Sequence, residues 1–267
     1  MAGIDEIRKN RLKKLKTIKN RGILPYPSKT KRTHTCKEAI KGFSKLSKSK
    51  KEIVLAGRLM SQRQHGGLTF CDIWDGTEKI QILFKKDRIG ERGYRFFLEN
   101  FDIGDFIEAR GTLFKTKKKE KTLQVSDFKI LAKSLLPLPE KWHGLKDVEE
   151  RYRKRYLDLI FNKEVREKFK IRSRIIKEIR EFERDFFEET SLECRFCDEA
   201  IDILLTHAIK EDLDIISICQ RFAKDLELGL KLVKDRTGQD IFEITREALL
   251  SPEDYIRGLI KSAYKGV

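Results

Sequence analysis

Apolar and polar residues alternate along residues 52–131, as they do in β-strands whose two faces meet different surroundings. Gly66-Gly67 and Asp75-Gly76 interrupt the alternation and predict tight turns between successive strands. The pattern therefore predicts three strands within 52–84, a short helix near 90–100, and two further strands at 105–114 and 121–131.

Helical spacing precedes this stretch. Leu12, Leu15 and Ile18 recur every three residues, which predicts a helix over residues 4–21 with one apolar face for docking. The opposite face carries basic residues, namely Arg11, Lys13, Lys14, Lys16 and Lys19. Residues 23–51 are rich in lysine and serine. This composition predicts a connector, with a short helix at about 36–42.

Helical spacing also follows the alternating stretch. A proline-containing linker at 134–147 leads into a helical pattern over 148–189, and residues from 191 onward are helical except near 235–244. The domains predicted from these patterns are a basic N-terminal helix and connector (1–51), a barrel domain (52–133), a linker (134–147), a helical segment (148–190) and a helical C-terminal region (191–267).

Three strands, a helix and two more strands follow one another in the order of the five-stranded OB-fold β-barrel, whose open face binds oligonucleotides. A small barrel with an unrelated role fits the same order. The predicted fold class is α+β, with an N-terminal helix and an OB-fold barrel followed by an all-helical C-terminal region.

The charge of the chain points to an anionic partner. The 267 residues include 59 Lys and Arg against 43 Asp and Glu, a net charge of +16. Residues 1–60 carry +14 of this, whereas residues 191–267 carry −4. A basic stretch of this kind is typical of a protein that binds a polyanion, most often nucleic acid, although a solvated arm without a partner has the same composition.

Several classes of protein are disfavoured. No apolar run reaches the roughly 18 residues of a membrane span, and the basic N-terminus has no apolar core of a secretory signal. Five scattered cysteines do not form a disulfide framework and suit a reducing compartment. We therefore expect a soluble cytoplasmic protein with no membrane partner.

A family resemblance rests on two neighbouring stretches, PLPEKWHGLKD at 137–147 and ERYRKRYLDL at 150–159. They resemble the hinge and the first catalytic-domain helix of class II lysyl-tRNA synthetases. Upstream, the stretches Arg11-Leu12, Gly22-Ile23, AGRLM at 56–60 and GTLFKT at 111–116 are similar to the same family's anticodon-binding domain. The resemblance covers about residues 8–187.

The resemblance implies a barrel that grips the anticodon loop of a lysine tRNA. It assigns Phe70 as the ring that stacks on a base, with Gln81, Arg63 and Asp127 as polar readers or contacts. The alternation agrees for Phe70 and Gln81, which fall on the strand faces opposite Cys71 and Ile82 respectively. Packing under a loop is the alternative for Phe70, and a phosphate contact is the alternative for Arg63. The face of Asp127 depends on whether its strand is bulged.

Lysines are expected to bind the phosphate backbone of the RNA. The candidates lie on the first helix and on the hairpin tip at 115–121, and they are Lys13, Lys14, Lys16, Lys117, Lys118 and Lys119.

The resemblance ends near residue 187. The full-length family continues with a strand and a proline of the dimer interface and with two arginine motifs that hold ATP, and none of these is found here. We therefore predict no catalytic residue and no cofactor for this chain, although the full-length family uses ATP and Mg. The expectation is a truncated chain that binds tRNA without catalysis, with a homodimer or a completing synthetase fragment as a further partner.

Two alternatives concern the C-terminal region. Its spacing weakly resembles the helical lid of AAA+ ATPases, so a protein-interaction adaptor whose tail is the functional part is the second function considered; a working ligase is the third. No GxxxxGK[ST] loop accompanies the lid. Cys194 and Cys197, with His207 and Cys219, also suggest zinc, but helical packing explains them better and no metal site is predicted.

Overall fold

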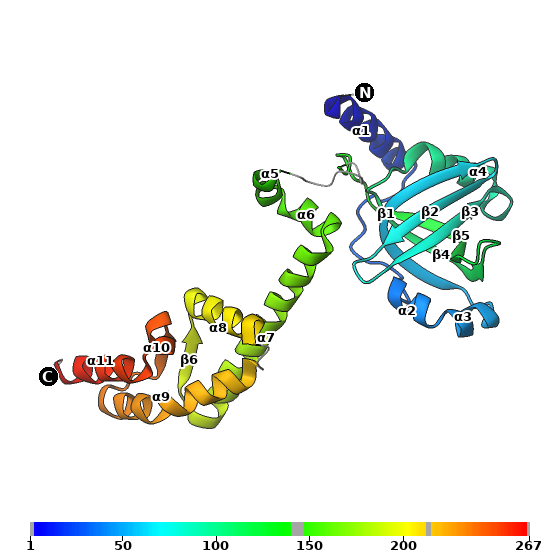
Figure 1. Ribbon diagram of the computed structural model, residues 1–267. Helices are drawn as coiled ribbons and strands as arrows, with labels where there is room; N and C mark the ends of the chain where they lie inside the picture. The colour runs from blue at the N-terminus through cyan, green and yellow to red at the C-terminus, as the bar shows by residue number, and fades with distance from the viewer. Residues whose placement is uncertain (1–2, 140–146, 212–214, 266–267) are drawn as a thin grey trace. The chain divides into compact units, whose positions relative to one another are not determined.

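The computed structural model describes residues 3–139, 147–211 and 215–265, and its chain divides into two compact units, Met1–His143 and Gly144–Val267 (Figure 1). The first unit contains α1 (Ile4–Asn20), α2 (Cys36–Lys41), α3 (Phe43–Ser49), β1 (Ile53–His65), β2 (Leu68–Trp74), β3 (Lys79–Lys85), α4 (Lys86–Asn100), β4 (Phe106–Lys115) and β5 (Lys121–Ala132). The second contains α5 (Val148–Arg153), α6 (Arg155–Phe161), α7 (Lys163–Thr190), β6 (Glu193–Phe196), α8 (Asp198–Glu211), α9 (Ile215–Thr237), β7 (Ile241–Ile244), α10 (Arg246–Leu250) and α11 (Pro252–Lys265).

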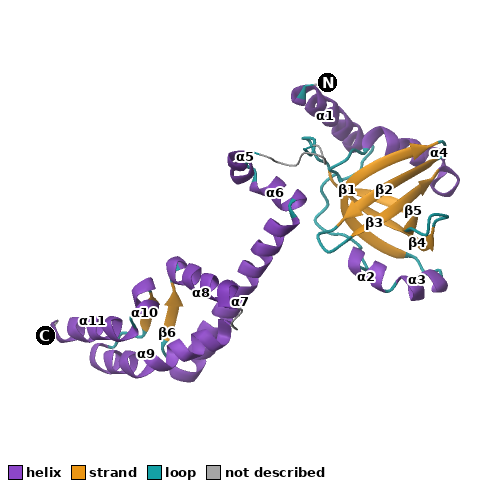
Figure 2. Cartoon of the chain, viewed as in Figure 1, coloured by secondary structure: helices purple, strands orange, loops and turns teal. Residues whose placement is uncertain are grey.

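The five strands of the first unit close into a barrel in the order β1-β2-β3-β5-β4 (Figure 2). All neighbouring pairs are antiparallel except β3 and β5, which run parallel. Cys71, Ile73, Ile82 and Phe84 are fully buried inside the barrel, so the alternation of the sequence separates its inner and outer faces. The predicted α+β class and OB-fold barrel are confirmed.

The connector contains two helices rather than the one that was expected. Thr35 and Glu38 form a capping box at the start of α2, and the carboxylate of Asp75, in the β2–β3 turn, accepts the Cys36 amide at 2.8 Å. Helix α3 follows after Gly42 and is anchored by the buried ring of Phe43. Helix α3 is not predicted from the sequence pattern, because lysine and serine surround that single apolar anchor.

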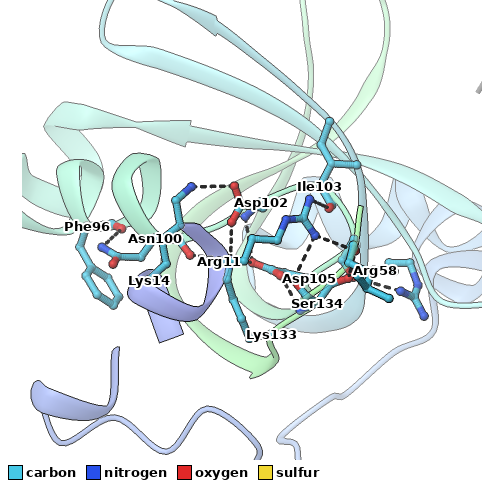
Figure 3. A network of polar contacts seen from close by, with 12 residues as sticks. Arg11, Lys14, Arg58, Phe96, Asn100, Asp102, Ile103, Asp105, Lys133 and Ser134 are labelled. Carbon is cyan, nitrogen blue, oxygen red and sulfur yellow. Dashed lines mark hydrogen bonds and ion pairs between the residues drawn. The ribbon is translucent and has the colours of Figure 1, made fainter. Parts of the chain in front are cut away.

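Helix α1 docks on the barrel through cations as well as through its apolar residues (Figure 3). Arg11 is buried and donates to the backbone carbonyls of Ile103, Ser134 and Leu136 at 2.9–3.0 Å. The expectation that Arg11 lies on the outward basic face is therefore wrong, because a guanidinium can satisfy several unpaired carbonyls at once. Leu12, placed on the docking face by its spacing, is instead 42% exposed.

A fully buried ammonium lies beneath this contact. Lys133 donates to Asp102 at 2.5 Å, to Asp105 at 2.7 Å and to the Asn100 carbonyl at 2.9 Å (Figure 3). Burial acts to raise the pKa of Asp102, but the hydrogen bonds from Lys133 and Lys14 outweigh it and lower that pKa. Burial raises the pKa of Asp105 against the attraction of Lys133. The pair Asp102 and Asp105 thus shares one cation that has no access to water.

The second unit is mainly helical, as predicted, but it is not entirely helical. Strands β6 and β7 form a small parallel sheet, with Cys194 opposite Phe242 and Phe196 opposite Ile244. The sequence pattern predicts the extended piece near 241–242, which is part of β7. It does not predict β6, because four residues are too few to show a period of two.

One core joins α7 to the C-terminal region. Ile175, Ile179 and Phe186 of α7 are buried in the same cluster as Leu192 and Phe222. The domain boundary predicted at residue 190 therefore lies within the second compact unit, Gly144–Val267. The predicted linker at 134–147 falls partly outside the described residues, since residues 140–146 are among those the structure leaves out.

Replacing Lys133 with methionine should lower the free energy of unfolding of the first unit by about 3–5 kcal/mol, because two carboxylates would lose their buried partner. Urea denaturation followed by tryptophan fluorescence measures this, since Trp74 lies on β2 of the barrel and the sequence contains no tryptophan after residue 143. The control is Lys129→Met, whose contact with Glu108 is 3.6 Å long and partly exposed, and which should cost at most about 1 kcal/mol. Equal losses in the two variants would contradict the role of the buried cluster.

Candidate nucleic-acid interface

Strand register aligns the outward side chains of the barrel in rows that run across the strands. In the first row Arg63 of β1 lies opposite Phe70 of β2, Phe70 opposite Leu83 of β3, and Leu83 opposite Gln124 of β5. Neighbouring strands are about 4.8 Å apart, so side chains in one row contact one another. The structure therefore brings Arg63 and Phe70 together as direct neighbours.

A second row runs beside the first. Ser61, Asp72, Gln81 and Thr122 follow one another from β1 to β5. The two rows are two residues apart on every strand, and the bulge at Met60 in β1 lies just beyond the second row. Because Gln81 and Phe70 lie in adjacent rows on adjacent strands, the two residues predicted to meet bases share one surface.

Phe70 lies on the outside of the barrel. Its side chain is half-buried, and it does not belong to the cluster of side chains that fills the barrel interior. Leu83 beside it is buried, and Arg63 on its other side is 55% exposed. A half-buried ring supported by an apolar neighbour is a suitable platform for stacking with a nucleobase.

Thr122 fixes the orientation of Gln81. The Thr122 hydroxyl is fully buried and donates to the Gln81 side-chain oxygen at 2.9 Å. The Gln81 amide nitrogen has no hydrogen-bond partner among the residues that the structure describes. Gln81 therefore presents two N–H donors that no described group occupies. The sequence analysis did not identify Thr122. A hydroxyl side chain at the start of the predicted strand 121–131 was the feature that could have indicated it.

Asp72 provides the negative charge of this surface. Its carboxylate accepts from the Ser61 hydroxyl at 2.5 Å, and it lies 3.8 Å from the Arg63 guanidinium and 4.0 Å from the Lys79 ammonium. A mostly buried carboxylate between two exposed cations attracts both toward the rows. The sequence pattern identifies Asp72 only as a residue of this face, whereas the structure shows that it forms an ion pair with Arg63.

Asp127 is not part of the two rows. Strand β5 is bulged at Ser126, because Asp127 pairs with Arg110 whereas Val125 pairs with Gly111. Asp127 is exposed, and its carboxylate accepts the amide of the next residue at 2.8 Å. It lies three residues beyond Gln124, about 10 Å further along the strand.

The predicted phosphate contacts divide into two groups. Lys13 and Lys16 are exposed on α1, but Lys14 forms an ion pair with Asp102 at 2.6 Å and is not a free cation. The expectation for Lys14 is corrected accordingly. At the β4–β5 tip the side chains are all exposed, and they belong to Lys117, Lys118 and Lys119.

The cysteines of the second unit pack as apolar residues. Burial raises the pKa of the Cys194 thiol to about 12, so this thiol stays protonated at neutral pH. Within the described part of the chain, no three His, Cys, Asp or Glu side chains are grouped so that they could hold a metal ion. No described helix combines the length and the apolar character needed to cross a membrane.

Comparisons with known proteins agree with this geometry. Residues 53–131, from the first residue of β1 almost to the end of β5, match the family described as "OB-fold nucleic acid binding domain". The chain is 52% identical over 179 residues to the Lysine--tRNA ligase of Carboxydothermus hydrogenoformans, a match that covers 67% of this chain and 36% of that protein.

Two further relatives carry the same name. The Lysine--tRNA ligase of Pelotomaculum thermopropionicum is 46% identical over 179 residues, and that of Clostridium botulinum is 46% identical over 187 residues. These matches cover 67% and 69% of this chain but 35% and 36% of the relatives. The chain thus spans about a third of the length of the curated relatives it matches. It contains an OB-fold nucleic acid binding domain and, over two thirds of its length, an N-terminal match to lysine--tRNA ligases at about 50% identity.

Proposed function

We propose that this chain binds a transfer RNA by receiving the bases of the anticodon loop on the two rows of the barrel. The observation that carries the proposal is the placement of Phe70 and Gln81 in adjacent rows on the face formed by β2 and β3. OB barrels bind oligonucleotides on this face. The relatives are named for a reaction on tRNA, which supports tRNA as the nucleic acid.

The chemistry of the rows suits unpaired bases. Phe70 supplies an aromatic face on which any base can stack, so it contributes affinity with little sequence preference. The two N–H donors of Gln81 match carbonyl oxygens on a base edge, and its oxygen keeps one lone pair for a base N–H. Uracil offers that combination of two carbonyls and one N–H, which fits the anticodon of a lysine tRNA.

In this proposal Arg63 and the exposed lysines of α1 and of the β4–β5 tip bind the phosphate backbone of the RNA. Arg63 is half-exposed beside Phe70 and reaches a phosphate or a base edge equally well. Asp127 is the weakest candidate because it lies beyond the rows. The ligation reaction of the relatives is not part of the proposal, and neither the homodimer nor the completing fragment has support in the geometry. The reported similarities also give the adaptor alternative no support.

Replacing Phe70 with alanine should weaken binding of an RNA hairpin with the lysine anticodon by about 1–3 kcal/mol, roughly 5- to 150-fold, through lost stacking. Fluorescence anisotropy measures the dissociation constant. Phe106→Ala is the matched control, because Phe106 is also half-buried on the barrel exterior, where it packs 4.3 Å from the Arg58 guanidinium. An unchanged affinity of Phe70→Ala would remove Phe70 from the interface.

Replacing Thr122 with valine keeps the shape of the buried side chain but removes the hydrogen bond that orients Gln81. The loss should be about 0.5–1.5 kcal/mol and should appear as weaker discrimination between uracil and cytosine in the anticodon. Competition binding with the two hairpins measures it. A variant that loses affinity equally for both hairpins would show that Thr122 acts on folding rather than on recognition.

A chain that ends at residue 143 should retain the affinity of the full chain for the hairpin within about threefold, because the rows lie wholly within the first compact unit. The same binding assay compares the two chains. Loss of most of the affinity would place part of the interface in the second unit. A cut at residue 190 is unsuitable, since it would separate Ile179 and Phe186 from Leu192.

A further inference from the structure

The largest group of cations in the first unit lies on two segments that are far apart in sequence. Residues 36–52, which hold α2 and α3, contain six lysines, and residues 115–121, the β4–β5 tip, contain five. All eleven side chains are exposed, and the two segments contain three glutamates. Six of these lysines belong to the connector, to which the sequence analysis gave no function. We call the two segments together the lysine platform.

Direct contacts make the platform one surface. The Lys121 ammonium donates to the Ile40 carbonyl at 3.0 Å. The ammonium groups of Lys121 and Lys115 lie 5.6 and 6.0 Å from the centre of the Phe43 ring. Phe43 is buried, so it fixes α3 against the start of the tip.

The other end of the platform is fixed by the β2–β3 turn. Burial alone would raise the pKa of Asp75, but hydrogen bonds from Thr77 and from the Cys36 and Glu78 amides outweigh it and lower that pKa. Asp75 is therefore ionised at neutral pH, and its contribution is lost only as the pH falls through its lowered pKa. At neutral pH the Asp75 carboxylate thus holds the start of α2 against the β2–β3 turn.

The charges of the platform are available to a ligand. Glu38 is occupied by its own helix cap, and Glu52 accepts from the Ser126 hydroxyl at 2.6 Å. None of the eleven lysines forms an ion pair with a carboxylate of any described residue. No large apolar side chain of the platform is exposed. Such a surface can neutralise phosphates but cannot stack on bases.

The platform borders the row that contains Gln81. Lys121 directly precedes Thr122, which pairs with Gln81, and Lys37 donates its amide to Thr77 in the turn before β3. Helix α1 lies at the other side of the barrel, next to α4 (Figure 1). An RNA whose loop covers the rows therefore meets the platform at the Gln81 side and α1 at the other.

We propose that the lysine platform binds the phosphates of the paired RNA stem that adjoins the loop held on the rows. This inference rests on the proposed function and extends it from the loop to the stem. A continuous stem presents regularly spaced phosphates and keeps its base faces covered, which matches a surface with charge and no exposed ring. The connector lysines of α2 and α3 thereby gain a role in RNA binding together with those of the β4–β5 tip.

The test compares K37Q/K41Q/K45Q with the control K168Q/K224Q/K261Q, which removes three exposed lysines of the second unit. Binding of the full chain is measured against salt concentration with two probes, the anticodon hairpin and an RNA of the loop alone. The platform variant should make the hairpin's slope of log affinity against log salt shallower by about 2 to 3, since each lost duplex contact contributes about 0.9. The loop RNA and the control variant should show no change.

Three results would speak against the platform. An unchanged hairpin slope in the platform variant would overturn the inference while the proposed function stands. An equal change with both RNAs would overturn the assignment to the stem. If the unmodified chain binds neither RNA, the proposed function itself is wrong and the inference is overturned with it. Circular dichroism of each variant verifies that the helices are intact.

Discussion

The parallel pairing of β3 with β5 is the contact on which the organisation of the first unit depends. It joins residues 81–83 to residues 122–124 and so closes the barrel between two otherwise antiparallel sets of strands. The same pairing brings Thr122 beside Gln81 and Gln124 beside Leu83. The two rows are therefore a consequence of barrel closure, which also supplies the Thr122 hydroxyl that holds Gln81.

Charge is arranged differently at the two ends of this barrel. Around Lys133 the ionic groups are buried and paired, and Asp102 of this cluster also pairs with Lys14 of α1. Arg11 of the same helix donates to nearby backbone carbonyls, so both cations serve the docking of α1. On the lysine platform the cations are exposed and unpaired with described carboxylates. Net charge alone therefore does not distinguish a docking cation such as Arg11 from an exposed one such as Lys45.

The sequence predicted those features that follow from local periodicity. Alternation placed Phe70 and Gln81 on the outer face, because a period of two separates the faces of a strand whatever its partners are. Features that depend on distant partners were not predictable. Arg11 is buried because carbonyls some 90 to 125 residues away accept its donors, and Asp127 is displaced by a bulge that only the pairing with β4 reveals. Helix α3 and strand β6 are too short for a period to emerge, and packing of Phe43 and Phe196 determines them.

The second unit shows that similarity and structural boundaries do not coincide. The resemblance to lysyl-tRNA synthetases ends near residue 187, yet Ile179 and Phe186 on its near side share a core with Leu192 and Leu230 on its far side. Residues of one core depend on one another for burial, so the two stretches form a single folding unit. The boundary that separates independent structure lies near residue 143 instead. The two rows of the candidate interface lie before that boundary, on the strands of the first unit.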